Sequence, residues 1–232
     1  MEEKSFNIHH ISDTHGFHTQ LKIPDNVDIL IHSGDSTNQK NPFLNWNEFI
    51  NFVKWYSSIP VKYKILISGN HDSSLESLKK DAKELLKDNG IIYLEDELIK
   101  IEEIMIYGTP WTPTFEDWCF MKNRDKMYKV WEKVPLDTNI LISHGPPKGI
   151  LDLTENRDYT LEQVGDKAIL KYLEKWKDLK YVLFGHIHNR GNITNTGIRE
   201  LDGIKFINSS GVEDGRFDKG IIYNGTTFNF KI

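Results

Sequence analysis

Short, mostly apolar runs recur along the chain. They occupy residues 6–11, 28–32, 65–68, 138–143 and 181–184. Continuous apolar runs of four to six residues, without polar alternation, are typical of strands that are buried on both faces, as in parallel sheets. We therefore expect five central strands at these positions.

Helical periodicity follows two of these runs. Apolar residues recur at intervals of three and four within residues 46–53 and again within 75–86. Ser74 is a candidate N-cap for the second helix, and Asn89-Gly90 is a typical helix end. Strands that alternate with helices predict a parallel, doubly wound first half.

The remaining segments are shorter and richer in β patterns. We expect a strand at 91–93, a hairpin from 98–101 and 104–107, a rigid Pro-rich loop at 108–113, helices at 125–131 and 168–176, and short strands from 197 onward. No linker or repeat divides the chain. This predicts one domain over residues 1–232, made of two β-rich halves.

The net charge of the chain limits the kinds of molecule that it is expected to bind. The 232 residues carry a formal net charge of −5. This does not fit a chain that grips nucleic acid through a broad basic face. A small phosphate-bearing substrate stays compatible, because bound metal ions would reverse the local charge. The single cysteine, Cys119, is expected to be a half-buried structural thiol.

The first residues lack an apolar signal region, and no run of 18 apolar residues occurs. We therefore expect a cytoplasmic protein that does not interact with membranes. The sequence carries no signal for an oligomeric state.

Potential ligands follow each of the five expected central strands. They are Asp13 and His15, Asp35, Asn70 and His71, His144, and His186 and His188. In open α/β sheets, ligands bind just beyond the carboxyl ends of the strands. If the turns extend the strands, alternate residues such as Asp13 and His15 point the same way. We therefore expect these side chains to converge.

Carboxylate, imidazole and amide ligands together suit borderline divalent metals such as manganese, iron or zinc. Eight such residues are too many for one ion, because a zinc site usually takes four ligands. Two ions that share one carboxylate account for the set more economically.

These motifs resemble, in order, those of the calcineurin-like metallophosphoesterases. The matching segments are Asp13-Thr14-His15, Gly34-Asp35, Gly69-Asn70-His71-Asp72, Ser143-His144-Gly145 and Gly185-His186-Ile187-His188. Residues 107–113, 117–118 and 144–147 resemble the small branch of metallophosphoesterase-domain-containing proteins that includes brain protein 239. The resemblance implies a four-layer αββα sandwich with a dinuclear metal centre at one edge.

The resemblance also implies a role for each matching residue. One metal would be held by Asp13, His15, Asp35 and His188, and the other by Asp35, Asn70, His144 and His186. His71 would be the catalytic histidine, beside the metals but not bound to them. The cofactors expected are two divalent ions, with manganese first and iron, zinc, magnesium or nickel as alternatives.

The activity that the resemblance implies is hydrolysis of small phosphodiesters such as cyclic nucleotides, by attack of a metal-bridging hydroxide. The alternatives are a phosphomonoesterase, a nuclease, or a non-catalytic interaction module on the same fold. The net charge speaks against a nuclease, and the complete ligand set speaks against an interaction module.

One departure from larger relatives bears on the substrate. Residues 36–39 lack the second Asp and the Arg that follow the Gly-Asp motif in protein serine/threonine phosphatases. This disfavours a protein phosphatase and leaves the group that orients His71 open, with Asp72 as one candidate. Trp111, in its Pro-rich loop, is either core packing or an apolar wall for the substrate.

Overall fold

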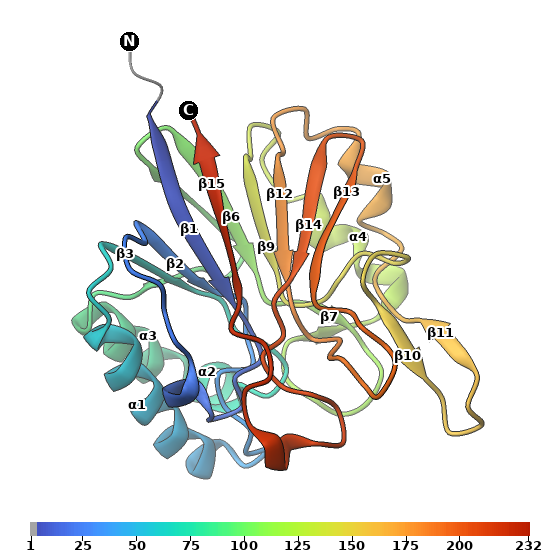
Figure 1. Cartoon of the computed structure of the whole chain (residues 1–232), viewed down its shortest axis with the longest axis horizontal. Helices are drawn as coiled ribbons and strands as arrows, with labels where there is room; N and C mark the ends of the chain where they lie inside the picture. Colours follow the sequence, from blue (N-terminus) through green and yellow to red (C-terminus); the bar gives the residue numbers. More distant parts are fainter. Residues whose placement is uncertain (1–3) are drawn as a thin grey trace.

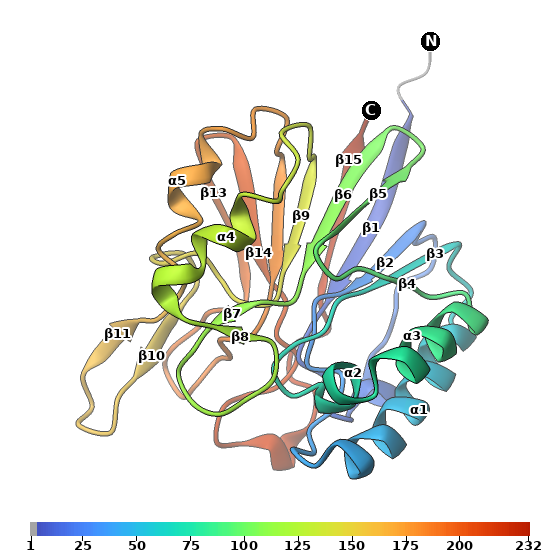
Figure 2. The same cartoon turned by 180° about the vertical axis from the view of Figure 1, so that it is seen from behind.

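Two β-sheets lie face to face in the computed structural model, which describes residues 4–232 (Figure 1, Figure 2). The first sheet has the order β15-β1-β2-β3-β4. Its strands are β1 (Ser5–Ile11), β2 (Ile29–His32), β3 (Tyr63–Leu66), β4 (Ile92–Tyr93) and β15 (Thr226–Lys231). β1 to β4 are parallel, and β15 pairs antiparallel with β1.

The second sheet has the order β13-β14-β12-β9-β6-β5. Its strands are β5 (Glu97–Ile101), β6 (Ile104–Thr109), β9 (Ile140–Ser143), β12 (Tyr181–Phe184), β13 (Gly197–Leu201) and β14 (Ile204–Asn208). The four inner strands are parallel, and β5 and β13 close the edges as antiparallel hairpins.

Helices cover the outer face of each sheet. The first sheet is covered by α1 (Pro42–Ser58), α2 (Ser73–Ser77) and α3 (Lys79–Asp88), and the second by α4 (Tyr128–Trp131) and α5 (Leu170–Leu173). Three 3-10 turns are η1 (His18–Gln20), η2 (Arg124–Lys126) and η3 (Phe217–Lys219). Two small ribbons complete the fold: β7 (Thr112–Pro113) with β8 (Met121–Lys122), and β10 (Leu153–Glu155) with β11 (Leu161–Gln163), which projects from the body (Figure 1).

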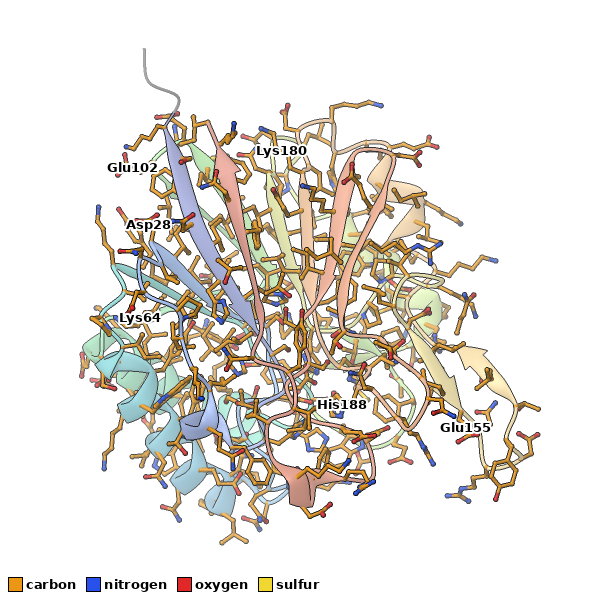
Figure 3. All side chains as sticks on the ribbon, in the orientation of Figure 1. Asp28, Lys64, Glu102, Glu155, Lys180 and His188 are labelled. Atoms are coloured by element: carbon orange, nitrogen blue, oxygen red, sulfur yellow. The ribbon has the colours of Figure 1, made fainter. Side chains whose placement is uncertain are left out.

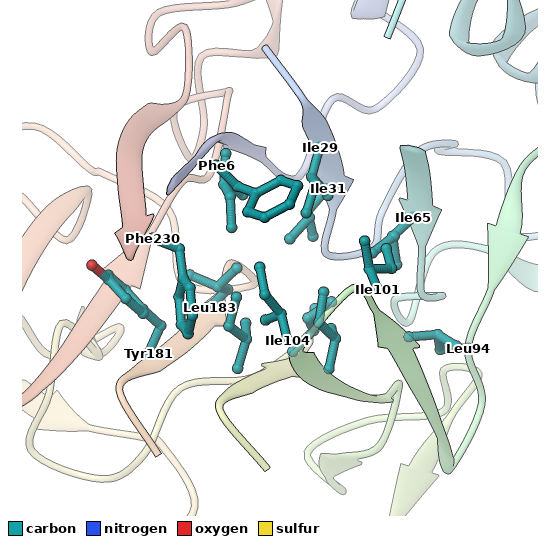
Figure 4. Packing of buried hydrophobic residues seen from close by; sticks show 14 of the residues in the cluster. Phe6, Ile29, Ile31, Ile65, Leu94, Ile101, Ile104, Tyr181, Leu183 and Phe230 are labelled. Carbon is teal, nitrogen blue, oxygen red and sulfur yellow. The ribbon is translucent and has the colours of Figure 1, made fainter. Parts of the chain in front are cut away.

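The central strands are apolar throughout because both of their faces are buried. In β2, Ile29 and Ile31 face the core between the sheets, whereas Leu30 packs against the helices. Figure 4 shows Ile31 in the same core as Ile104 and Leu183 of the second sheet. The αββα sandwich is therefore confirmed. The doubly wound first half is wrong, since helices cover only one face of that sheet and the other face packs against the second sheet.

The predicted strands and the 98–107 hairpin are confirmed, with ends shifted by up to two residues. The predicted loop at 108–113 is partly strand, because β6 extends through Thr109 and the β7 residues pair with β8. The predicted helices at 125–131 and 168–176 are reduced to the single-turn helices α4 and α5.

The predicted helix after Ser74 is divided in two. α2 ends before Leu78, whose φ and ψ of −112° and 36° break the helical path, and α3 then runs to Asp88. Ser74 is not a cap: it lies inside α2, and its hydroxyl donates to Asn45 Oδ1 at 2.7 Å. Asn89 caps the end of α3, as predicted.

Candidate metal centre

The carboxyl ends of parallel strands from both sheets meet at one edge of the sandwich. β1, β2 and β3 are neighbours in the first sheet, and β9 and β12 are neighbours in the second. The Asp13 amide donates to the Gly34 carbonyl at 2.9 Å, and the Gly185 amide donates to the His144 carbonyl at 3.0 Å. Figure 3 shows His188 beneath the converging strand ends. The structure thus brings the polar clusters after all five strands to one place.

The first group of donor atoms belongs to Asp13, His15 and His188. His188 Nε2 lies 3.0 Å from Asp13 Oδ1, and 3.4 Å from His15 Nε2. All three side chains are buried. Two imidazole nitrogens and a carboxylate oxygen therefore point into a single small space.

The second group belongs to Asp35, Asn70, His144 and His186. His144 Nε2 lies 3.2 Å from Asp35 Oδ2 and 3.1 Å from Asn70 Oδ1. The rings of His144 and His186 lie with centroids 5.0 Å apart. Asp35 Oδ2 also lies 3.8 Å from His15 Nε2, so Asp35 stands between the two groups.

These distances fit divalent metal ions. Ligand atoms about 2.1 Å from one ion, at angles of about 90–110°, lie roughly 3.0–3.4 Å from each other. The separations within each group, 3.0 and 3.4 Å in the first and 3.1 and 3.2 Å in the second, match this spacing. Nitrogen and oxygen donors of these kinds suit borderline divalent metals. The residues present therefore fit two ions.

The imidazoles divide into two electrostatic classes. Burial lowers the pKa of His15 and of His186 to about 3, so both rings are neutral and ready to act as ligands. Burial also opposes protonation of His144, but the carboxylate of Asp35 outweighs it and raises the pKa of His144 to about 9. A metal ion must therefore displace a proton from His144 at neutral pH.

The two buried carboxylates of the site, those of Asp13 and Asp35, are both ionised. Burial disfavours the anion of Asp13, but the hydrogen bond and charge of His188 outweigh burial and lower the pKa of Asp13. Burial also opposes protonation of His188, but the pairing with Asp13 and the contact with Asp214 outweigh it and raise the pKa of His188 to about 10. The pKa of Asp35 is also well below its usual range, because His144 and His71 oppose the effect of burial. Both carboxylates are thus anionic at neutral pH and available to bind a metal ion.

Left-handed backbone, rather than strand continuation, turns the ligands inward. The φ angles of Asp13, His15, Asp35 and His186 are 50°, 43°, 56° and 68°. A non-glycine residue in this region costs on the order of 1–3 kcal/mol, and such residues cluster at functional sites. The expected convergence is therefore present, but its expected cause, alternation along an extended chain, is wrong.

Close packing at the site requires glycine at two positions. A Cβ at Gly185 would overlap the carboxylate of Asp13 and the hydroxyl of Ser12. A Cβ at Gly34 would lie 2.6 Å from His144 Nδ1, and its φ of 104° is in any case strained for other residues. The glycines before Asp35 and His186 thus allow the ligands of different strands to approach each other.

Asp72 joins the turn after β2 to the turn after β3. Its buried carboxylate accepts hydrogen bonds from the amides of Asp35 and Gly69, at 2.9 and 2.8 Å. It also accepts bonds from Ser36 Oγ, Thr37 Oγ1 and the Thr37 amide. Asp72 therefore does not orient the His71 ring, as the sequence had suggested it could, but ties together the turns that carry Asp35 and Asn70.

His71 lies beside the first group of donors. Its amide donates to Asp35 Oδ1 at 2.7 Å, and its ring Nδ1 lies 3.4 Å from the carbonyl oxygen of Asn38. The ring meets the edge of His15 at a centroid distance of 4.7 Å, and the ring of Trp118 at 4.2 Å. His71 is thus held by a carbonyl and by aromatic contacts rather than by a carboxylate.

A cleft of about 410 Å³ opens over both groups. Its lining includes Asp35, Asn70, His71, His186 and His188, together with Phe115, Trp118, Arg124 and Phe217 from surrounding loops. The arrangement combines buried metal-binding donors with a cavity large enough for a small organic phosphate.

Comparison with known proteins decides the family. A family model described as calcineurin-like phosphoesterase matches residues 6–190. The chain belongs to this family. The resemblance seen in the five motifs is thereby confirmed. Membership in a family of metallophosphoesterases implies divalent metal ions, and the donor groups described above could bind them.

Relatives of the metallophosphoesterase-domain-containing type are also similar to this chain. Metallophosphoesterase domain-containing protein 1 of Homo sapiens is 32% identical over 200 residues, which cover 77% of this chain and 59% of that protein. UPF0046 protein K07C11.7 of Caenorhabditis elegans is 30% identical over 200 residues, which cover 81% and 65%. The chain thus spans less than two thirds of the length of these relatives.

A solved structure supports the fold. It is 12% identical in sequence, has a TM-score of 0.67, and covers 98% of this chain and 99% of its own. Within residues 4–232, no helix of this calcineurin-like phosphoesterase combines the length and the apolar character that a membrane span requires.

Two further residues, not among those predicted from the sequence, lie at the candidate metal centre. Ser210 Oγ donates to Asp13 Oδ2 at 3.1 Å, and Asp214 Oδ1 lies 3.4 Å from His188 Nδ1. Both follow β14, and the polar run after this strand was the available signal. Arg216, two residues further along, lines a neighbouring hollow instead.

Among residues 4–232, those that line the cleft do not include Trp111. Its ring packs against Phe120 and lies under the ammonium of Lys122, at 3.7 Å, and its indole donates to Asp96 at 3.2 Å. The aromatic rings that line the cleft include those of Phe115 and Trp118. The packing alternative for Trp111 is therefore the correct one.

Proposed function

We propose that this chain is a metal-dependent phosphodiesterase that hydrolyses small phosphodiesters, with cyclic nucleotides among the candidate substrates. The observation that carries the proposal is that two groups of metal-binding donors lie side by side and share Asp35. One ion would be held by Asp13, His15, Asp35 and His188, and the other by Asp35, Asn70, His144 and His186.

Two divalent ions, when bound, would neutralise the phosphate oxygens and bring the pKa of a water between them toward neutrality. Manganese is the first expectation for this donor set, with iron, zinc, magnesium or nickel as alternatives. Family membership supports divalent metals in general.

His71 would serve as the catalytic acid. The carbonyl oxygen of Asn38 can only accept a hydrogen bond, so the hydrogen between them belongs to Nδ1 of His71. To act as the acid, the ring would carry a second proton on Nε2, and this is the proton that would pass to the leaving oxygen of the substrate. Because the His71 amide binds Asp35, the ring is fixed relative to the shared carboxylate.

The loop after Asp35 supports a diester over a monoester. Ser36 and Thr37 direct their hydroxyls to Asp72, and neither supplies a cation. A monoester dianion benefits more than a diester from an additional guanidinium, which binds phosphate oxygens in pairs. A diester carries less charge, so the metal ions and His71 would be sufficient to neutralise its phosphate and to protonate its leaving group.

Two other activities have less support. A nuclease for long nucleic acids is disfavoured by the net charge of −5. A non-catalytic interaction module would not need the complete and closely spaced donor set that this chain retains.

The test compares bis(4-nitrophenyl) phosphate with 4-nitrophenyl phosphate, which share a leaving group. Metal-free protein is loaded with each candidate metal, and kcat/KM is measured at one pH. We expect the diester to be preferred by about tenfold or more in the best metal. Asp35→Asn serves as the control for background hydrolysis. A preference for the monoester would refute the diesterase, and failure of every metal to support hydrolysis would refute the enzyme.

A further inference from the structure

Arg124 is the one lysine or arginine among the lining residues of the cleft in the described part of the chain. It lies in η2, far in sequence from the five ligand motifs, and its side chain is exposed. The role of this cation is not explained by the metal centre, which is built from carboxylates, imidazoles and an amide.

Main-chain carbonyls hold the Arg124 guanidinium. Nη2 donates to the oxygen of Val164 at 3.2 Å, and Nη1 donates to the oxygen of Gly165 at 3.4 Å. Arg124 forms no ion pair with any residue from 4 to 232. An arginine has five N–H donors, so three remain for a further acceptor. The carboxylate of Asp166 interacts with the Arg124 charge but forms no ion pair with it.

The acidic residues that line the cleft contact side chains other than Arg124. Glu116 accepts a hydrogen bond from the Trp118 indole at 3.2 Å, and Asp214 lies beside His188 Nδ1. Asp35, the third acidic residue of the lining, lies 3.2 Å from His144 Nε2, and none of the three forms an ion pair with Arg124. The cleft therefore presents one permanent positive charge at a fixed place, without an ion-pair partner among residues 4–232.

Arg124 stands one layer outside the metal ligands. Its acceptor Gly165 packs against the turn that follows His144: a Cβ at Gly165 would lie 2.7 Å from the oxygen of Pro146. The neighbouring Asp166 amide donates to that same oxygen at 2.9 Å. The turn at Pro146 thus lies between the proposed metal ligands and the carbonyl groups that hold the guanidinium. A phosphate bound between the metals would have its substituent, rather than its own oxygens, directed toward Arg124.

We propose that Arg124 binds a second phosphate group carried by the substituent of the scissile diester. The preferred substrates would then be linear phosphodiesters with a terminal phosphate. A phosphate offers three acceptor oxygens and up to two negative charges, which match the three remaining donors of a guanidinium better than a carboxylate does. This inference rests on the proposed diesterase and narrows its substrate class.

The experiment compares two dinucleotides that differ only in a terminal phosphate, adenylyl-adenosine and its 5′-phosphorylated form. For the manganese-loaded wild type, we expect the phosphorylated form to have a kcat/KM about tenfold higher or more, the scale of a charge-assisted hydrogen bond. Arg124→Gln should reduce this ratio to near one, and Arg124→Lys should retain part of it. Lys126→Gln removes the same charge from η2 outside the cleft lining and should keep the wild-type ratio.

Equal kcat/KM for the two dinucleotides in the wild type would overturn the inference. So would an equal fold loss on both in Arg124→Gln, since that would place the arginine at the scissile phosphate or in loop structure. Calorimetric affinities of both dinucleotides for the metal-loaded protein separate this inference from the diesterase proposal. If neither is cleaved, a tighter binding of the phosphorylated form that disappears in Arg124→Gln still supports the arginine site, and equal binding refutes it.

Discussion

The ring of Trp118 lies against the ring of His71, with centroids 4.2 Å apart and planes tilted by 33°. The carbonyl of Asn38 and the edge of His15 complete the surroundings of this histidine. Trp118 is itself tied down, because its indole donates to Glu116 and the ammonium of Lys40 lies 5.0 Å from its ring. Packing, rather than an acidic partner, orients the proposed catalytic acid.

This contact leads to the first prediction. Trp118→Ala should lower kcat by about tenfold to a hundredfold, because a small displacement of a catalytic group is costly. Metal content should not change, since Trp118 supplies no metal ligand. Trp118→Phe should restore most of the rate by keeping a ring against His71. The measurements are steady-state kinetics with a small synthetic diester and metal analysis of each variant.

Trp111→Ala is the matched control for this prediction. Trp111 packs between the core and Lys122, outside the cleft lining. Because Trp111 is only partly buried, we expect its removal to lower stability by less than the roughly 3–5 kcal/mol of a fully buried tryptophan, with little change in kcat of the folded protein. A kcat loss equal to that of Trp118→Ala would contradict the different roles assigned to the two tryptophans.

The second prediction separates catalysis from metal binding. His71→Ala should retain both metal ions and lose on the order of 10²–10⁴ in kcat, the usual contribution of a positioned acid. His144→Ala should instead lose metal. Elemental analysis and kinetics on the same preparations make the comparison. Loss of a metal ion from His71→Ala would show that this histidine is a ligand. The test is needed because His71 lies close to His15 and Asp35.

The third prediction concerns the shared carboxylate. The wild type should bind two ions per chain, and Asp35→Asn should lower the affinity for both, because Asp35 lies between the donor groups. Calorimetric titration of metal-free protein gives the stoichiometry. Saturation at one ion, with no change in Asp35→Asn, would be incompatible with a shared ligand.

The fourth prediction tests Asp72 as the link between turns. Asp72→Ala would leave the amides of Asp35, Gly69 and Thr37 without their buried acceptor. At about 1–3 kcal/mol for each unsatisfied group, the free energy of unfolding should fall by about 3 kcal/mol or more. Asp72→Asn keeps one acceptor oxygen and should lose less. Urea unfolding of the metal-free protein measures both, and an Ala variant as stable as the wild type would disprove the link.

The fifth prediction follows from the raised pKa values of two ligands. In metal-free protein, His144 and His188 have pKa values of about 9 and about 10, so both carry a proton at neutral pH. Metal ligation requires the neutral ring, so binding should release about two protons per chain and should weaken as the pH falls. Titrations in buffers of different ionisation enthalpy count the protons. Metal affinity that does not change between weakly acid and weakly alkaline pH would contradict this protonation scheme.

The sequence by itself determined the strands and the residues gathered at their ends. A run such as Ile29–Ile31 can be apolar on both faces only if both faces are buried, and that property is local to the chain. The positions of Asp35 and His144 just past such strands then follow, because parallel strands bring their carboxyl ends to one edge. The family could be inferred from the order of these motifs.

The tertiary structure decided everything that depends on packing between distant segments. Periodicity shows that a strand is covered on both faces but not whether helices or a second sheet cover it, so the doubly wound prediction was wrong. An adjacent position suggested Asp72 as the partner of His71, yet its carboxylate is drawn to the free amides of the Asp35 turn. Likewise, nothing local distinguishes Trp118 from Trp111. Only the folding of their loop places one ring against His71 and the other against the edge of the core, because side-chain surroundings are set by contacts across the chain.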